Sequence, residues 1–409
     1  MQGRNKPLLR FLEQAVFRLI DKRRSALILG PRQVGKTTLV KKALATRGNV
    51  LEYGLQDPSV RLEIEKDPPR IIREVRAHGS RPYVFVDEAQ KVPEVFDAAQ
   101  VLIDSGEASF LFTGSSARKL RKAGVNLLPG RIERKFLDPL TWGELGLIKQ
   151  ATLQGLVMEN INTKAAYSFE DALVYGSLPG MVSLPEQDRR GMLTAYASLY
   201  LEEEIRAEAL ARKIGAFSRF LELAAHESGT SPNFTKLSNE SGVSQPAVKE
   251  FYRILEDTLV VERIDPYLKN ARKRILSTPR YYFFDVGVRN ALARLPLDRH
   301  LVNAQKGVLF EHAVVLEIIR RIRALNKQYT VHYWRTSGGA EVDCVIDAGR
   351  SVIPIEIKAS AHVARSELKG LKNFMEEYAR VAKHGYVITM GQRKERLDER
   401  ITALPWFYL

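Results

Sequence analysis

The sequence has 409 residues, of which 45% are hydrophobic and 27% charged, as in globular proteins with two or three domains. The 63 Lys and Arg against 48 Asp and Glu give a formal net charge of +15. This excess favours polyanionic partners, with nucleic acid first and an acidic membrane surface second, although a basic protein without such a partner remains the alternative. The single cysteine, Cys344, excludes an internal disulfide and a cysteine-based zinc site.

The N-terminal region carries no sign of a membrane segment. No apolar run approaches the roughly 20 residues that span a bilayer. Arg10, Glu13 and Arg18 interrupt the apolar residues near the N-terminus, which argues against a signal peptide. We therefore expect a cytoplasmic protein without membrane contacts.

Residues 1–145 alternate short apolar runs with helical patterns. Helices are expected at 36–46 and 92–105. The apolar runs, which we expect to be buried parallel strands, lie at 26–29, 50–51, 83–86 and 110–113. This β-α alternation predicts an α/β fold with a doubly wound parallel sheet.

The motif G-x-x-x-x-G-K-[ST] occupies residues 30–37, between the first expected strand and the first expected helix. Gly30 and Gly35 would let the backbone fold around a phosphate so that its N–H groups point inward. Lys36 would reach the β- and γ-phosphates, and the Thr37 hydroxyl would bind Mg²⁺. The alternative, a glycine-bearing turn, is disfavoured by the strand–loop–helix context. We therefore expect ATP and Mg²⁺ as cofactors, with these nucleotide-binding residues: Gly30, Pro31, Arg32, Gln33, Val34, Gly35, Lys36, Thr37, Thr38 and Thr113.

The third apolar run ends in Asp87 and Glu88. Carboxylates at the end of a buried strand require partners, so they favour a site over a core. Asp87 is expected to bind Mg²⁺ through water, and Glu88 to orient and polarise the attacking water of a phosphoryl transfer. Thr113 would either sense the γ-phosphate or simply terminate its strand. Arg131 is either a solvated surface residue or an arginine finger supplied to a neighbouring subunit.

The middle of the chain is predicted to be helical. Residues 146–225 fit a compact helical lid, broken at 175–180. Residues 226–275 read as a helix-turn-helix with two helices around a turn at 241–244, followed by a wing strand at 259–264.

Two basic runs accompany these segments. The run after the expected wing would neutralise DNA phosphates or form a solvated linker; its residues are Lys269, Arg272, Lys273 and Arg274. The other run would face a central channel or water; its residues are Arg118, Lys119, Arg121 and Lys122.

The C-terminal region, 276–409, returns to an α/β pattern. Two expected strands place Asp343, Glu356 and Lys358 in D-x(12)-E-x-K spacing, with Glu356 and Lys358 on one strand face. In the PD-(D/E)xK arrangement of nucleases, the two acids would hold Mg²⁺ and Lys358 would orient or activate a water, with Glu311 as an additional polar group. The alternative is a nuclease-like fold that serves only DNA binding or subunit packing.

The motif at 30–37, together with 86–91, 112–116, 129–131, 176–180, 282–287 and 310–312, resembles the prokaryotic AAA+ ATPases that carry a C-terminal DUF4143 region. The resemblance covers nearly the whole chain. It implies four parts, namely an AAA+ core (1–145), a helical lid (146–225), a winged helix (226–275) and a domain similar to restriction-endonuclease folds (276–409). It also implies a ring, usually a hexamer, with active sites shared between subunits, which favours the trans-acting role for Arg131.

These observations predict a Mg²⁺-dependent ATPase acting as an oligomeric, DNA-binding motor or remodeller with a nuclease-like C-terminal domain. Two alternatives remain, an ATP-controlled switch that regulates a protein partner and a DNA-junction clamp with weak hydrolysis. The expected catalytic residues are Lys36, Asp87, Glu88, Arg131, Asp343, Glu356 and Lys358, and the expected metal ligands are Thr37, Asp87, Asp343 and Glu356.

Overall fold

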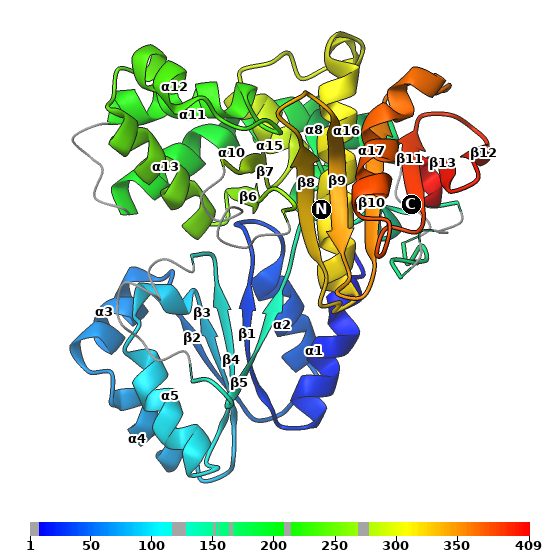
Figure 1. Cartoon of the computed structure of the whole chain (residues 1–409). Helices are drawn as coiled ribbons and strands as arrows, with labels where there is room; N and C mark the ends of the chain where they lie inside the picture. The colour runs from blue at the N-terminus through cyan, green and yellow to red at the C-terminus, as the bar shows by residue number, and fades with distance from the viewer. Residues whose placement is uncertain are drawn as a thin grey trace. The chain divides into compact units, whose positions relative to one another are not determined.

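The computed structural model describes residues 8–116, 128–149, 153, 155–162, 167–207, 214–268 and 278–409 (Figure 1). The chain divides into two compact units, residues 1–139 with 254–260 and residues 140–253 with 261–409. No helix within the described ranges is long and apolar enough to cross a bilayer. Both predicted basic runs, 118–122 and 269–274, lie outside the described residues.

The first unit contains a five-stranded parallel sheet in the order β2-β3-β4-β1-β5. Its strands are β1 (Ser25–Leu29), β2 (Val50–Gly54), β3 (Tyr83–Asp87), β4 (Ser109–Gly114) and β5 (Ile132–Phe136). β3 and β4 are buried along their whole length, which explains why their sequences are continuous apolar runs. The predicted parallel α/β sheet is confirmed.

Helices cover both faces of this sheet. They are α1 (Phe11–Asp21), α2 (Lys36–Leu44), α3 (Pro58–Lys66), α4 (Arg70–Ala77) and α5 (Val95–Asp104), with a 3₁₀ turn η1 (Ala89–Lys91). The face that carries Phe110 and Phe112 packs against α3, α4 and α5 in one apolar cluster, where Phe96 stacks on Phe112 with ring centroids 4.6 Å apart. α1 and α2 contact each other and lie on the other side (Figure 1). All strand carboxyl ends therefore meet at one edge, next to the start of α2.

The second unit begins with helical segments, as predicted for the lid region. The helices are α7 (Trp142–Leu145), α8 (Phe169–Tyr175), α9 (Pro179–Val182), α10 (Glu186–Ala207), α11 (Ile214–His226), α12 (Phe234–Ser241), α13 (Gln245–Asp257), α15 (Val286–Leu292), α16 (Arg299–Ala324) and α17 (Lys369–Glu377).

The predicted helix-turn-helix corresponds to α12 and α13. Asn233 caps α12 by accepting a 3.0 Å hydrogen bond from the Lys236 amide, and Gly242 ends the helix with φ 73°. The predicted wing strand is β6 (Val261–Ile264), which pairs antiparallel with β7 (Arg280–Phe283). The hairpin thus crosses the predicted boundary at 275/276, and the four-part division of the chain stays a prediction.

The C-terminal region forms a separate six-stranded mixed sheet in the order β12-β13-β11-β10-β9-β8. Its strands are β8 (Thr330–Arg335), β9 (Glu341–Asp347), β10 (Val352–Lys358), β11 (Gly385–Thr389), β12 (Glu395–Asp398) and β13 (Ile401–Pro405). β8, β9 and β10 run antiparallel, whereas β10, β11 and β13 are parallel. α17 packs Leu371 and Phe374 against this sheet, so the predicted C-terminal α/β domain is present.

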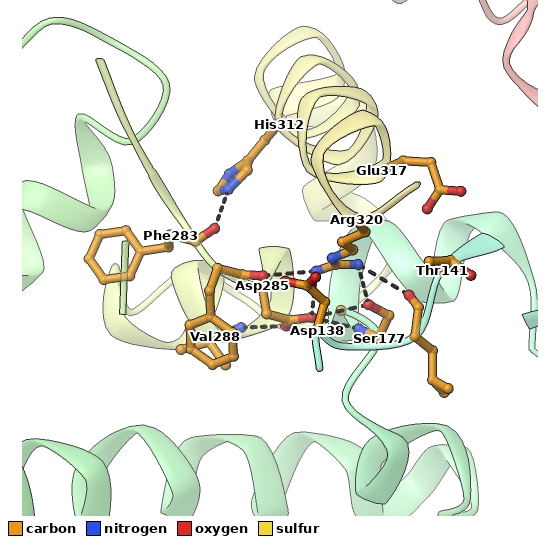
Figure 2. Close-up of polar contacts among 12 residues, drawn as sticks. Asp138, Thr141, Ser177, Phe283, Asp285, Val288, His312, Glu317 and Arg320 are labelled. Carbon is orange, nitrogen blue, oxygen red and sulfur yellow. Dashed lines mark hydrogen bonds and ion pairs between the residues drawn. The ribbon is translucent and has the colours of Figure 1, made fainter. Parts of the chain in front are cut away.

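A buried ion pair organises the centre of the second unit (Figure 2). Asp285, at the start of α15, accepts hydrogen bonds from the Ser177 and Val288 amides at 2.8 and 3.1 Å, and lies 3.7 Å from the Arg320 guanidinium of α16. Arg320 also donates to the Phe284 carbonyl at 2.8 Å. Burial raises the pKa of Asp285, and the Arg320 charge opposes that rise. Because each charge has several partners, the pair is tolerated in the interior.

Two glycines allow this close packing. A Cβ at Gly176, where φ is 74°, would lie 1.8 Å from Asp285 Oδ1, and a Cβ at Gly287 would lie 2.2 Å from the Tyr175 carbonyl. These are the glycines of the motifs at 176–180 and 282–287. Both motifs therefore have a structural role in bringing α8 and α15 together.

We predict that Gly176→Ala lowers the free energy of unfolding by about 3 kcal/mol or more, because it adds a clash with a buried carboxylate to an unfavourable backbone conformation. Gly180→Ala is the matched control, since its Cβ would meet no atom within 4 Å, and helix propensity gives it an effect of ~1 kcal/mol or less. Thermal and urea unfolding measure both. Equal stability of the two variants would contradict the packing role.

Candidate functional site

The loop at residues 30–35 has the backbone of a phosphate cradle. Gln33 and Gly35 both adopt positive φ, 62° and 94°, and alternation of this kind turns successive N–H groups to one side. Gly30 lies against the end of β5, where a Cβ would be 2.1 Å from the Leu137 carbonyl oxygen. α2 begins at Lys36 directly after the loop, so the positive end of its dipole faces the same space.

Lys36 is buried with its ammonium over this loop. Its Nζ donates to the Gly30 and Pro31 carbonyls at 2.9 and 2.8 Å. Burial lowers the pKa of Lys36 to about 8, opposed by the charges of Glu88 and Asp87. The lysine is thus a cation in a desolvated setting that would bind anionic groups strongly.

Asp87 joins three elements at the edge of the sheet. The Thr37 hydroxyl donates to both Asp87 carboxylate oxygens at 2.9 and 3.0 Å. The Thr113 hydroxyl, from β4, also donates to Asp87 and accepts from the Glu88 amide at 3.0 Å. The structure therefore brings together the side chains of Thr37, Asp87 and Thr113, whose hydroxyl and carboxylate oxygens are of the kind that Mg²⁺ prefers.

Glu88 has a strained backbone and a restrained side chain. Its φ is 57°, the left-handed region that non-glycine residues seldom adopt. Its Oε2 accepts from Gln90 Nε2 at 2.6 Å and from Ser115 Oγ at 2.9 Å. Gln90 and Ser115 lie in the motifs at 86–91 and 112–116, but no role was predicted for either. Their positions just beyond the ends of β3 and β4, at the edge where Asp87 lies, are the signal that could have identified them.

The other predicted nucleotide-binding residues differ in exposure. Pro31 and Val34 are buried, whereas Gln33 and Thr38 are exposed; Arg32 is half-buried. One residue that the sequence analysis did not place in the site is Arg10, whose guanidinium bonds to the Val34 carbonyl at 2.7 Å.

Arg131 lies at the opposite edge of the sheet. It precedes β5, whose first residue, Ile132, pairs with Ser25 at the start of β1. Its guanidinium bonds to the carboxylate of Asp104 at 2.5 and 3.0 Å in an exposed pair, an interaction of small energetic value. Arg131 therefore does not contribute to the phosphate loop of its own chain.

The predicted C-terminal residues gather on β9 and β10. Cys344 pairs with Ile355, so Asp343 and Glu356 follow on the adjoining positions of the two strands. Asp343 Oδ2 accepts from the Ile357 amide at 2.8 Å, and Lys358 Nζ lies 2.7 Å from Glu356 Oε1. We call Glu311, Asp343, Glu356 and Lys358 the acid centre.

β7 supplies partners of the acid centre that the sequence analysis missed. The Tyr282 hydroxyl donates to Glu311 Oε1 at 2.8 Å. Arg280 pairs with Glu341 and lies 3.9 Å from Glu311. Arg280 and Tyr282 belong to the run Arg-Tyr-Tyr-Phe of β7. Their distance in the sequence from Glu311 and Glu341 matches no known motif, so the sequence did not indicate these contacts.

Burial raises the pKa of Glu311, Asp343 and Glu356, and the charge of Asp343 raises the first and last further. Glu356 Oε2 is buried and has no hydrogen-bond partner among the described residues. Within the described ranges, however, no group of three or more His, Cys, Asp or Glu side chains is arranged to hold a metal ion. The carboxylates are suitable oxygen donors, but the Ile357 amide, Lys358 and Tyr282 each bond to one of them.

Protein-family models match three separate segments of the chain. An AAA domain family matches residues 22–146, a domain of unknown function (DUF8612) matches 166–299, and a second domain of unknown function (DUF4143) matches 306–409. Uncharacterized proteins of Mycobacterium tuberculosis and Mycobacterium bovis are each 26% identical over 391 residues, covering 93% of this chain and 79% of theirs.

Among solved structures, the Walker-type ATPase of Pyrococcus abyssi is 15% identical, with a TM-score of 0.45, and the match covers 70% of this chain and 98% of that chain. The AAA family match contains the phosphate loop, Asp87, Glu88 and Thr113, whereas the DUF4143 match contains the acid centre. The chain therefore carries an AAA-type P-loop ATPase domain and a C-terminal DUF4143 domain.

Proposed function

We propose that this protein is a Mg²⁺-dependent ATPase that works as an oligomeric DNA-binding motor or remodeller. The observation that carries the proposal is the arrangement of Thr37, Asp87, Thr113 and Glu88 beside the phosphate loop. Oxygen donors, a buried lysine and a helix N-terminus converge there, and phosphoryl transfer depends mainly on such positioning and charge neutralisation.

Each residue has a distinct proposed role. The Lys36 ammonium would leave the Gly30 and Pro31 carbonyls for the β- and γ-phosphates, and the loop amides would cradle the same groups. The Thr37 hydroxyl and Asp87 would hold Mg²⁺, which supplies charge neutralisation at the phosphates. Glu88 would orient the attacking water after leaving Gln90 and Ser115.

The proposal of a DNA partner rests on the helix-turn-helix and the net charge. In residues 234–257 the basic side chains are Lys236, Lys249 and Arg253, and the acidic ones are Glu240, Glu250, Glu256 and Asp257. This segment is therefore close to neutral, and phosphate attraction would have to come from elsewhere, with the basic run at 269–274 as our first choice. A ring, with a hexamer as the expected form, would place Arg131 at a neighbouring subunit's nucleotide.

A second candidate activity is Mg²⁺-dependent cleavage of nucleic acid at the acid centre. It is favoured by three carboxylates with raised pKa values beside Lys358, of which Glu356 is buried and Glu311 and Asp343 are half-buried, an arrangement that is costly unless a site requires it. Asp343 and Glu356 would hold Mg²⁺, and Lys358 would orient or activate a water. If this activity is lacking, the ATP-controlled switch on a protein partner and the DNA-junction clamp become the favoured alternatives.

ATP hydrolysis is the first test. We predict that Lys36→Ala and Glu88→Gln each reduce kcat by about 100-fold or more, since each removes a charge used in the transition state. Lys41→Ala is the control on the same helix, because among the described residues Lys41 forms an exposed pair with Glu52 and no other. Stimulation of the wild type by single-stranded, duplex or branched DNA would support the motor. Hydrolysis without a DNA response would favour the protein-partner switch, and full activity in Lys36→Ala would refute the site.

Nuclease activity is tested separately. We predict cleavage of DNA only with Mg²⁺ and a loss of about 100-fold or more in Asp343→Ala and in Lys358→Ala. Asp347→Asn is the control on β9, because its carboxylate accepts a bond from the exposed Gly349 amide and from no other group in the described ranges. Cleavage that survives in Asp343→Ala, or none in the wild type, would rule out a nucleolytic acid centre.

The lowered pKa of Lys36 predicts a pH dependence of nucleotide binding. Without nucleotide, Lys36 loses its proton near pH 8, while phosphates favour the ammonium form. ATP phosphates are fully ionised in this range. Binding above pH 8 should therefore take up a proton, and the Kd for ATP should rise about tenfold per pH unit. Calorimetry in buffers of different ionisation enthalpy measures this uptake. Lys36→Arg, whose side chain stays charged, should lack it, and equal uptake in both proteins would refute the assignment.

A further inference from the structure

Arg10 is a buried cation with contacts at the phosphate loop. It immediately precedes α1 and is 9% exposed. Its Nη1 donates to the Val34 carbonyl at 2.7 Å, and its Nη2 donates to the Asp138 carbonyl at 2.6 Å. A Cβ on residue 35 would lie 3.9 Å from Nη1. One guanidinium thus joins the middle of the phosphate loop to the segment that follows β5.

The bond to Val34 has a direct consequence for the loop. Val34 lies between Gln33 and Gly35, the two residues with positive φ. Their conformations direct N–H groups to one side of the loop, so the Val34 carbonyl, bonded to Arg10, points away from that side. A charge-assisted bond from a buried guanidinium holds this carbonyl more firmly than water would. Arg10 therefore stabilises the backbone shape that receives phosphate.

The bond to Asp138 fixes the start of a connector that we define as residues 137–142. The Leu137 amide donates to the Leu29 carbonyl at 2.8 Å, at the end of β1. The Leu137 carbonyl lies against Gly30, where no Cβ fits. The first two connector residues are therefore held next to the phosphate loop, Leu137 by the end of β1 and Asp138 by Arg10.

The later residues of the connector are held within the second unit. The Leu140 amide donates to the Ser177 carbonyl at 2.9 Å, and the Leu140 carbonyl accepts from Arg320 at 3.2 Å. The Trp142 amide donates to Glu317 at 3.0 Å. Ser177, Arg320 and Glu317 surround this stretch (Figure 2). Pro139, whose ring fixes φ, lies between Asp138 and Leu140 in the sequence.

We propose that Arg10 is a positioning residue of the nucleotide site, which sets the shape of the phosphate loop and transmits nucleotide binding to the connector. Nucleotide that orders the loop also orders the Val34 carbonyl, and Arg10 carries this constraint to Asp138. With Pro139 as the only intervening residue, the constraint reaches Leu140 and the Ser177–Arg320 contacts. The inference rests on ATP binding at the phosphate loop.

The test compares full-length Arg10→Met and Arg10→Lys with Arg18→Met. Arg18 lies on α1, and its bond within the described part of the chain is an exposed one to the Gln14 carbonyl, so it is the control. For Arg10→Met the KM for ATP should rise about tenfold, because nucleotide would have to order the phosphate loop without the charge-assisted bond that preorganises it. The kcat should stay within about twofold, because the bond is made equally in the ground and transition states. Arg10→Lys, which keeps the charge, should give an intermediate KM.

Hydrogen exchange of residues 137–142 provides the second measurement, with and without saturating non-hydrolysable ATP analogue. The wild type and Arg18→Met should show slower exchange at Leu140 with the analogue, and Arg10→Met should not. If Arg10→Met does not fold, Arg10→Lys becomes the test variant. A KM and an exchange response equal to those of the wild type would then overturn the proposal. A folded Arg10→Met with unchanged KM or full protection at Leu140 overturns this inference alone. Absence of ATP binding by the wild type overturns the proposed function together with it.

Discussion

The nucleotide site depends on one carboxylate, that of Asp87, which lies almost fully buried at the end of β3. A buried charge is stable only when its oxygens are bonded. Thr37 on α2 and Thr113 on β4 supply those bonds. The bonds fix the start of α2 and the ends of β3 and β4 relative to one another. The phosphate loop, which ends at α2, is thereby placed beside the position of Glu88.

In the second unit, an ion pair compensates the buried charge. Asp285 and Arg320 come from distant parts of the chain, and both are buried. Removing one partner would leave an uncompensated buried charge, at a cost of about 3–5 kcal/mol. Gly176 must therefore remain without a side chain, because any Cβ would displace Asp285 from its amide donors. The motifs at 176–180 and 282–287 are explained by this packing without any catalytic role.

Sequence alone predicted the local features well. The parallel strands, the phosphate loop and the helix-turn-helix follow from continuous apolar runs, glycine positions and turn residues, all of which act over short stretches. Contacts between distant segments carried no such signal. Arg10 and Val34, Tyr282 and Glu311, and Gly176 and Asp285 are paired only once the chain has folded. Isolated polar residues such as Gln90 lack periodicity, so their roles depend on tertiary neighbours.

The two acidic sites differ in what restrains their carboxylates. Glu88 is held by two neutral donors, Gln90 and Ser115, whose bonds to the carboxylate oxygen are charge-assisted. In the acid centre, the Lys358 ammonium holds Glu356 Oε1, whereas Oε2 has no hydrogen-bond partner among the described residues. Release of Glu88 must therefore break two bonds, whereas Glu356 has one oxygen that needs no release. On this physical ground, the proposed hydrolysis of ATP requires a rearrangement of the Glu88 side chain, whereas a cation could approach Oε2 of Glu356 without displacing Lys358 from Oε1.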